Sequence, residues 1–249
     1  MNKLIFIIIL SILCTGLIAQ EAKWQFAPSL GIDMGGAIPV PLSSVPKGAK
    51  GTPKLKPNLG IAFQRNFNKR WSLDTEISYH ILSIDAVVNV ISQAFWSDDR
   101  SYATYFSGEA FSSTELQFIE IPLAAYYHFN DRWSLVFGGY YSIILNGKLE
   151  TEGRNGWISA DINDTDNTPL PGTQNTSFNF NDELDNYDIG ALIGYQWKVG
   201  ERVNLWGRFN VGFKSIFKPD FNNIDYDMYQ FRFSTGVSFV LWTKGSIST

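Results

Sequence analysis

The sequence predicts an all-β protein, an eight-stranded antiparallel up-and-down transmembrane β-barrel with four long external loops. Eight stretches alternate apolar and polar residues with a period of two, and most are long enough for the ~9–11 residues of a membrane-spanning strand. Their connections alternate between tight and long. Only 18% of the 249 residues are charged while 15% are aromatic, which is a low charge content for a soluble surface.

The first nineteen residues form the pattern of a secretory signal peptide. Lys3 precedes an apolar run over residues 4–13, and Ala19 follows small residues as a plausible cleavage site. The alternative, a membrane anchor, is disfavoured because the run falls short of the ~20 residues that a spanning helix needs. We therefore divide the chain into a signal peptide, 1–19, and an outer-membrane β-barrel domain, 20–249. Cys14 leaves with the signal.

The eight predicted strands and their connections place all tight turns at one end of a barrel. The strands are expected at 24–35, 56–66, 70–83, 114–130, 132–149, 186–199, 202–216 and 228–242. The tight turns at 66–69, 130–131 and 199–201 carry Asn, Asp or Gly, the residues that form turns. The long loops cover 36–55, 84–113, 150–185 and 217–227. Outer-membrane barrels have this asymmetry, with short periplasmic turns and long external loops.

One face of the predicted strands is almost free of charge, since Arg65 alone carries one and it lies beside a tight turn. Trp24, Trp71, Trp133 and Trp197 fall near the short-turn end, as in an aromatic girdle at a membrane interface. The alternative is a soluble barrel, which turns its apolar face inward. Strand length, the Trp positions and the one-sided loops favour the membrane.

The opposite face predicts a closed, charged lumen. Counting from the turns places six ionisable residues near one layer of the barrel: Asp33, Glu76, Glu120, Asp188, Arg208 and Arg232. An eight-stranded barrel is just wide enough for side chains to fill it, so these groups need one another as partners. Tyr126, Tyr140 and Trp206 add bulk. The alternative is a narrow ion path, or a pH-sensitive gate through His80 and His128.

No catalytic motif, cofactor site or multi-cysteine metal site is found, so an enzyme is not expected. The net charge of −4 argues against a nucleic-acid partner. Asp161, Asp164 and Asp166 form a weak candidate for Ca²⁺, but the loop lacks the glycine and distal Glu of an EF-hand. A solvated acidic loop is the preferred interpretation, so we assign no metal.

The second long loop carries a candidate contact site. Asp85 is expected to cap a short helix over residues 86–91. Five aromatic residues follow as a possible contact for a protein partner or a glycan: Phe95, Trp96, Tyr102, Tyr105 and Phe106. The plainer interpretation is that these residues cap the mouth of the barrel. The Lys-rich first loop suits the acidic third loop or lipopolysaccharide.

Residues 116–123 read LQFIEIPL, and are followed by Tyr126-Tyr127-His128-Phe129, Gly138-Gly139-Tyr140-Tyr141 and Leu145-Asn146-Gly147. This series resembles the PorT-like outer-membrane β-barrel family. The resemblance implies an eight-stranded barrel in the outer membrane of a diderm bacterium, and its namesake is an accessory of a protein-secretion system. It implies no catalytic residues. Pro122 lacks a ladder donor, so we expect a local bulge there with Glu120 aimed inward.

Together these observations predict a structural or interaction protein, or an export accessory, that acts through long external loops. The alternative is a narrow channel for ions or small solutes. The expected surroundings are outer-membrane lipid and lipopolysaccharide, with an envelope or secretion protein as a possible partner.

Overall fold

The computed structural model describes residues 23–41, 48–96, 103–159, 175–221, 223 and 226–244. The predicted signal peptide lies outside these residues. The strands are β1 (Lys23–Val40), β2 (Lys50–Lys54), β3 (Lys56–Asn66), β4 (Trp71–Trp96), β5 (Ala103–His128), β6 (Trp133–Ser159), β7 (Asn175–Asn179), β8 (Tyr187–Lys198), β9 (Val203–Ser215), β10 (Asp227–Phe239) and β11 (Trp242–Lys244). A short 3₁₀ helix, η2, covers Asn181–Glu183. In the described part of the chain, no helix has the length and apolarity to cross a membrane.

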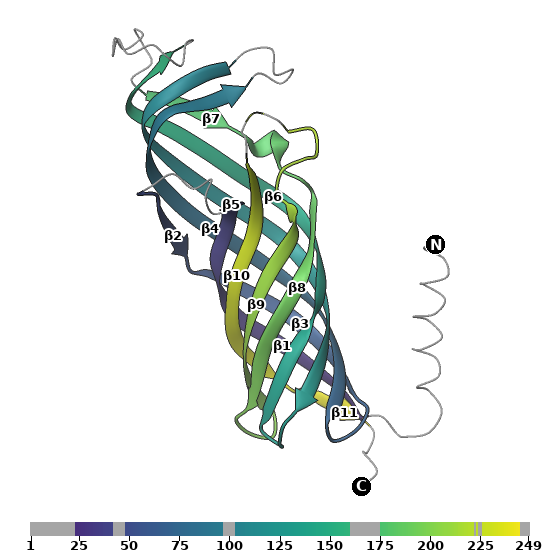
Figure 1. Ribbon diagram of the computed structural model, residues 1–249. Helices are drawn as coiled ribbons and strands as arrows, with labels where there is room; N and C mark the ends of the chain where they lie inside the picture. The colour runs from purple at the N-terminus through teal and green to yellow at the C-terminus, as the bar shows by residue number, and fades with distance from the viewer. Residues whose placement is uncertain are drawn as a thin grey trace.

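Eight strands close into an antiparallel ring (Figure 1). Their order is β10-β9-β8-β6-β5-β4-β3-β1, and β1 pairs with β10 from Ser29↔Ser238 to Val40↔Asp227. Sequential neighbours pair throughout, with β2, β7 and β11 as short additions to the ring. The predicted eight-stranded up-and-down topology is confirmed.

Two of the tight turns share one local motif. The side-chain oxygen of Asn68 accepts hydrogen bonds from the backbone N–H groups of Arg70 and Trp71, at 2.8 and 2.9 Å. Asn130 accepts the corresponding bonds from Arg132 and Trp133, both at 2.9 Å. An Asn side chain that bonds its own backbone two residues on mimics a turn, so each Asn fixes the reversal and sets a Trp at the start of the next strand.

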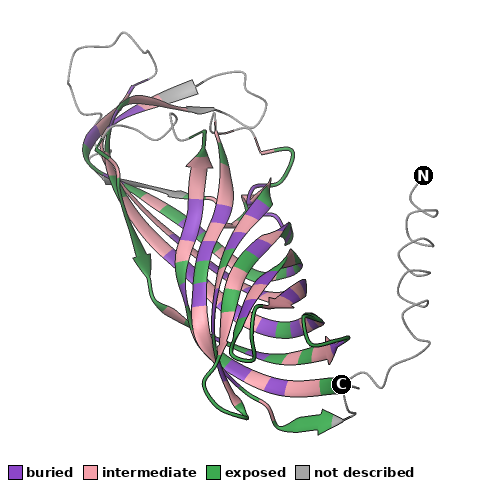
Figure 2. Ribbon diagram, turned by 60° about the horizontal axis from the view of Figure 1, so that its bottom comes forward, coloured by how far each residue is buried: buried purple, intermediate pink, exposed green. Residues whose placement is uncertain are grey.

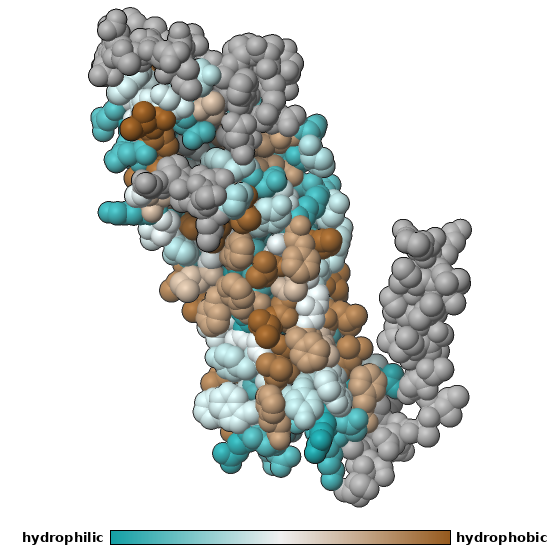
Figure 3. Space-filling model, viewed as in Figure 1, coloured by the Kyte–Doolittle hydropathy of each residue, from teal (hydrophilic) through white to brown (hydrophobic). Residues whose placement is uncertain are grey.

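Exposed and buried residues alternate along the strands, as Figure 2 shows. The exposed face is apolar on all eight strands of the ring and forms a belt, which Figure 3 shows on one side as a band across the lower half of the barrel. Members of this belt include Leu30, Ile32, Leu59, Ile61, Ile77, Leu123, Phe137, Ile193, Phe209 and Phe233. Apolar side chains so exposed on every strand require a hydrocarbon environment, because a soluble barrel would bury them.

The two edges of the belt mark the membrane-spanning part. At the short-turn edge Trp133 stacks on Trp197 with ring centroids 5.4 Å apart, and Arg65 lies over Trp24 at 5.1 Å. At the other edge the outer face becomes charged, beginning with Lys56, Glu115 and Lys148. Between these edges β4 runs from Trp71 to about Ile81, close to the ~9–11 residues that a spanning strand needs.

The predicted long loops are wrong in extent, because the strands continue far beyond the membrane. β4 continues to Trp96, β5 begins at Ala103, and the predicted helix over 86–91 is part of β4. The loops expected at 36–55 and 150–185 are likewise shortened by β1, β2, β6 and β7. In Figure 1 the β4–β5–β6 sheet rises above the rest of the barrel. Pairing with β5 overrides the local helical signal, since residues 84–90 retain a period of two.

Bulges adjust which side chains face inward. Gln117 pairs with Asn146 and Phe118 with Ile144, so Leu145 is an extra residue in β6. The bulge expected at Pro122 is wrong, because the register of β5 with β4 and with β6 is unchanged there. The missing Pro122 N–H leaves a gap in the β4 ladder instead, and the Thr75 hydroxyl donates to the Pro122 carbonyl at 3.0 Å.

Candidate functional site in the barrel lumen

Two ion pairs cross the lumen from wall to wall. Arg208 on β9 contacts Glu76 on β4, with 2.6 Å between Nη1 and Oε2. Arg232 on β10 contacts Glu120 on β5, with 2.5 Å between Nη2 and Oε2. In the ring, β9 lies opposite β4 and β10 lies opposite β5, because three strands separate each pair in both directions. Both pairs therefore bridge the full width of the barrel.

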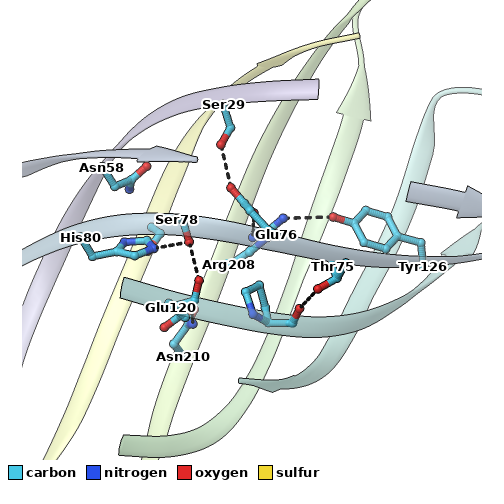
Figure 4. A network of polar contacts seen from close by, with 12 residues as sticks. Ser29, Asn58, Thr75, Glu76, Ser78, His80, Glu120, Tyr126, Arg208 and Asn210 are labelled. Atoms are coloured by element: carbon cyan, nitrogen blue, oxygen red, sulfur yellow. Dashed lines mark hydrogen bonds and ion pairs between the residues drawn. The ribbon is translucent and has the colours of Figure 1, made fainter. Parts of the chain in front are cut away.

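The first pair is held by hydrogen bonds from other strands (Figure 4). Ser29 donates to Glu76 Oε1 at 2.7 Å, and Arg208 Nη2 donates to the Tyr126 hydroxyl at 3.1 Å. The second pair receives Asn210, whose Nδ2 donates to Glu120 Oε1 at 3.2 Å. Charges taken out of water need such additional partners, so the surrounding polar groups make the buried pairs tolerable.

The remaining two predicted lumen residues bind neutral or imidazole partners. Asp33 lies 2.7 Å from His80 Nδ1, accepts from Asn58 at 2.7 Å and accepts from Ser234 at 2.6 Å. Asp188 accepts from the Tyr140 hydroxyl at 3.0 Å. All six predicted residues thus face the lumen.

The sequence interpretation missed the uncharged members of this network. Asn58, Ser78, Asn210 and Ser234 are all buried, and each bonds one of the ionisable groups or a residue beside it. Their common signal is position: they occupy the inward phase of strands at the level of the charged residues. Asn and Ser are also frequent in turns, so their type alone does not identify them.

His80 and His128 do not form one path. His80 lies in the charged layer, where it bonds Asp33 and Ser78. His128 lies near the tight turns, where its ring nitrogens contact Ser72 at 2.5 Å and Ser134 at 2.6 Å. Each imidazole is thus hydrogen-bonded within its own layer, which does not support the gate that their shared face suggested.

An apolar plug lies directly outside the charged layer. Its buried members are Ala37, Leu82, Leu116, Phe118, Leu149, Leu184, Ile216 and Phe217. Phe118 joins the two layers, since its ring stacks on His80 at 5.3 Å and lies 5.0 Å from the Arg232 guanidinium carbon. The charged layer and the plug together fill the middle of the barrel.

Cavities remain on both sides of this filling. Toward the tight turns a polar cavity of about 20 Å³ is lined by Gln64, Asp74 and Trp206 among others, which is room for about one water molecule. On the external side a cavity of about 390 Å³ is lined mainly by apolar side chains. The lumen is therefore layered, and its external third, built from residues that the sequence analysis took for loops, is mainly apolar.

The comparisons with known proteins agree with this architecture. A family model described as the outer membrane protein beta-barrel domain matches residues 18–218. The chain belongs to this family. Membership places the protein in the outer membrane as a β-barrel, which confirms the predicted localisation. No match was found among curated protein sequences.

Solved structures of other outer-membrane barrels resemble this chain distantly. Ail of Yersinia pestis has a TM-score of 0.40 at 10% identity, covering 88% of this chain and 99% of Ail. Neisserial surface protein A has 0.37 at 12%, covering 87% and 97%. OprG from Pseudomonas aeruginosa has 0.35 at 11%, covering 92% and 99%.

The predicted loop contact site is only partly described. Phe106 is 1% exposed, so its interpretation as an exposed contact is wrong. Its ring lies on the inner face of β5, over the close approach of Gly108 and Gly156. Tyr105 is half-buried, and Phe95 and Trp96 belong to β4 with side chains outside the described set. Tyr102 lies outside the described residues.

Metal ligands do not gather in the described part of the chain. Among these residues no group of three or more His, Cys, Asp or Glu side chains is arranged to hold an ion. The weak calcium candidate, Asp161, Asp164 and Asp166, lies outside the described residues.

Ion pairs on the outer surface mark the part of the barrel beyond the membrane. Lys54 contacts Asp85 at 2.8 Å, and Lys56 contacts Glu115 at 2.8 Å. The hydrogen bond from Lys54 lowers the pKa of Asp85, and the hydrogen bond from Lys56 lowers the pKa of Glu115. Partly exposed surface pairs of this kind contribute little stability, but they tie β2 and β3 to the extended β4–β5 hairpin.

Proposed function

We propose that this protein is a closed outer-membrane barrel that acts by binding at its external end, as a structural or interaction protein or an accessory of export. It performs no catalysis and conducts no ions in this proposal. Its immediate surroundings are outer-membrane lipid and lipopolysaccharide, and its partner is an envelope or secretion protein. The first nineteen residues are proposed as the signal that delivers the 20–249 barrel domain.

The observation that carries the proposal is the pair of ion bridges between opposite walls. Arg208–Glu76 and Arg232–Glu120 cross the lumen side by side, because β9 and β10 are neighbours on one wall and β4 and β5 are neighbours on the other. Opening a path requires both contacts to part, which leaves charges buried without partners. The apolar plug beyond them adds a second barrier. A lumen filled in this way supports a scaffolding role. The strands that extend beyond the membrane supply the surface that binds a partner.

The PorT-like assignment is the finer part of the proposal. It is supported by the Ile119-Glu120-Ile121-Pro122 series, whose Glu120 is the acidic end of one lumen bridge. The same series ends at Pro122, where the β4 ladder has its gap. Both features give the motif a structural role, and a structural role is consistent with barrels that assist export without chemistry of their own.

The second candidate is a narrow channel. It is favoured by the small polar cavity near the tight turns and by buried polar atoms that lack a protein hydrogen-bond partner, among them Asp74 Oδ1 and Arg232 Nη1. Groups of this kind are the ones that hydrate when a lumen opens. A channel nevertheless has to pass the plug, which is made of large apolar side chains.

The test of external binding is surface crosslinking in whole cells, followed by purification of the tagged barrel and mass spectrometry. The test variant replaces residues 86–111 with a tight turn, which shortens only the β4–β5 extension beyond the membrane. The control replaces outward Lys148 by Gln and leaves the extension intact. We expect one stoichiometric partner that is lost in the shortened variant and kept in the control. Recovery of the barrel alone in every case contradicts the proposal.

A further inference from the structure

The external cavity has the size of a small-molecule site. Its volume of about 390 Å³ falls within the ~300–1,000 Å³ of pockets that bind small ligands. Its wall is formed by the inner faces of β4, β5 and β6 where they rise beyond the membrane, with β1 and β2 on the other side. The plug forms its floor, since Leu149 and Phe217 belong to both.

The cavity lies where each of three strands places one small inward-facing residue beyond the plug. Leu82, Leu116 and Leu149 fill the lumen at the level of the plug. Further along the same strands, Ala86, Ala110 and Gly153 face the same space with little or no side chain. Protein interiors are normally packed to the density of organic crystals, so one small residue on each of three neighbouring strands leaves a volume for a ligand to occupy.

The lining is apolar with one charge at its edge. Ile84, Val88 and Phe106 form much of the wall. Among the described lining residues Lys50 alone carries a charge, and it is exposed. An apolar chamber with a single cation at the rim complements an amphiphile that has one alkyl chain and an anionic head.

The chamber also reaches the barrel wall between β1 and β2. The β1–β3 register ends at Asp33↔Lys56, and β2 pairs with β4. Ala37 and Pro39 of β1 line one side of the chamber, while Gly51 and Pro53 of β2 line another. Lys50, at the start of β2, places the one charge of the described lining on this side of the chamber.

We propose that this chamber binds the alkyl chain of a single-chain anionic amphiphile, with its head beside Lys50. The inference rests on the proposed function, because it names the ligand class of the same external end. Two sources share this chemistry: a free fatty acid, and a lysophospholipid of the envelope.

The test uses the full barrel in phosphatidylcholine nanodiscs, with dansylaminoundecanoate as a fluorescent probe. We expect saturable binding that dodecanoate displaces, with an affinity that rises about fourfold for each methylene along a series of shorter fatty acids until the chamber is full. Ala86→Trp fills the chamber and is expected to weaken binding at least tenfold. Asn89→Trp, on the outer face of the same strand and outside the chamber lining, is the matched control and leaves binding unchanged.

Two further variants separate packing from charge. Ala110→Trp fills the chamber from β5 and repeats the test if Ala86→Trp fails to fold. Lys50→Gln removes the rim charge, and we expect it to weaken dodecanoate by up to about fivefold while leaving dodecanol unchanged, because an exposed charge pair contributes little. Equal losses for both ligands contradict the assignment of the head to Lys50.

The outcomes distinguish the sources and the two proposals. Displacement by dodecanoate supports a free fatty acid, and displacement by dodecanoyl-lysophosphatidylglycerol alone supports an envelope lipid. Displacement by neither, or unaltered binding in folded Ala86→Trp, overturns the inference. Conductance of the same preparation is recorded separately: a barrel that conducts contradicts the proposed function, whereas a closed barrel that fails to bind contradicts the ligand alone.

Discussion

At the scale of single residues, the lumen shows how an outer-membrane barrel satisfies charge in a narrow interior. Glu76 and Glu120 each receive an arginine from the opposite wall and a neutral donor from another strand. Removing one partner of a buried pair costs more than removing an exposed pair, because it leaves the other charge without compensation. The network therefore stabilises the barrel only when each buried charge keeps its partner.

Arg208→Gln is expected to destabilise the barrel by roughly 3–5 kcal/mol, because Glu76 is then buried without its cation. The double variant Glu76→Gln with Arg208→Gln is expected to lose less, since neither charge remains. Urea unfolding in lipid vesicles, followed by Trp fluorescence, measures the difference. The control is Lys56→Gln, which breaks a partly exposed pair at the outer surface and is expected to cost ~1 kcal/mol or less. Equal losses of unfolding free energy for Arg208→Gln and Lys56→Gln would contradict this interpretation of the buried pairs.

The surface pair at Asp85 predicts a pH dependence. Because Lys54 lowers the pKa of Asp85, the pair contributes stability above the unfolded-state pKa of Asp, and that contribution is lost as the pH falls through the lower folded-state value. The carboxyl-carbon chemical shift of Asp85, followed by NMR across an acid titration, is expected to show a midpoint below about 3.9. Lys54→Gln should move the midpoint upward. A titration midpoint of Asp85 that is unchanged in Lys54→Gln would contradict the assignment of the lowered pKa to Lys54.

At the scale of elements, one extra residue decides which face of β6 lines the external chamber. Up to Ile144 the even-numbered residues of β6 face inward, and after Leu145 the odd-numbered ones do, so that Leu149 and Gly153 line the plug and the chamber. Without the bulge, Lys148 and Glu150 would turn into the lumen. A shift of one residue exchanges the two faces of a strand, and the bulge places the exchange at the edge of the membrane.

Deletion of Leu145 is therefore expected to disorder the external half of β6 while the membrane part stays paired. Hydrogen-exchange mass spectrometry is expected to show loss of protection in residues 147–159 and in the facing part of β5. Leu145→Ala keeps the extra residue and serves as the control, with protection unchanged. Full protection of the external half in the deletion variant would show that the bulge does not set the register.

Some of these structural elements could be predicted from the sequence and some could not. The period of two is a local property, so it located the strands, the outward Trp residues and the inward Glu76, Glu120, Arg208 and Arg232. The apolar run Ile143-Ile144-Leu145 interrupts the alternation where the bulge lies, but the run does not say which strand carries the extra residue. Residues 84–90 read equally as helix and strand until β5 is placed beside them.

At the scale of the whole molecule, the barrel is a stack of layers with different chemistry. A small polar cavity, a charged network, an apolar plug and an apolar chamber follow one another from the tight turns outward. The sequence predicted the charged layer but not the plug or the chamber, because which inward residues meet across the lumen depends on strand stagger and not on neighbouring residues. For the same reason, the sequence alone did not show which arginine pairs with which glutamate across the lumen.

The layered lumen makes a single prediction for the intact protein, which is that it does not conduct. Single-channel recording of the purified wild-type barrel in planar bilayers is expected to show no current steps above the leak of the bare membrane, while a porin added afterwards to the same bilayer does. Reproducible steps from the wild-type barrel, with a size or ion selectivity that changes in Arg208→Gln, would contradict a closed lumen and make the protein a channel.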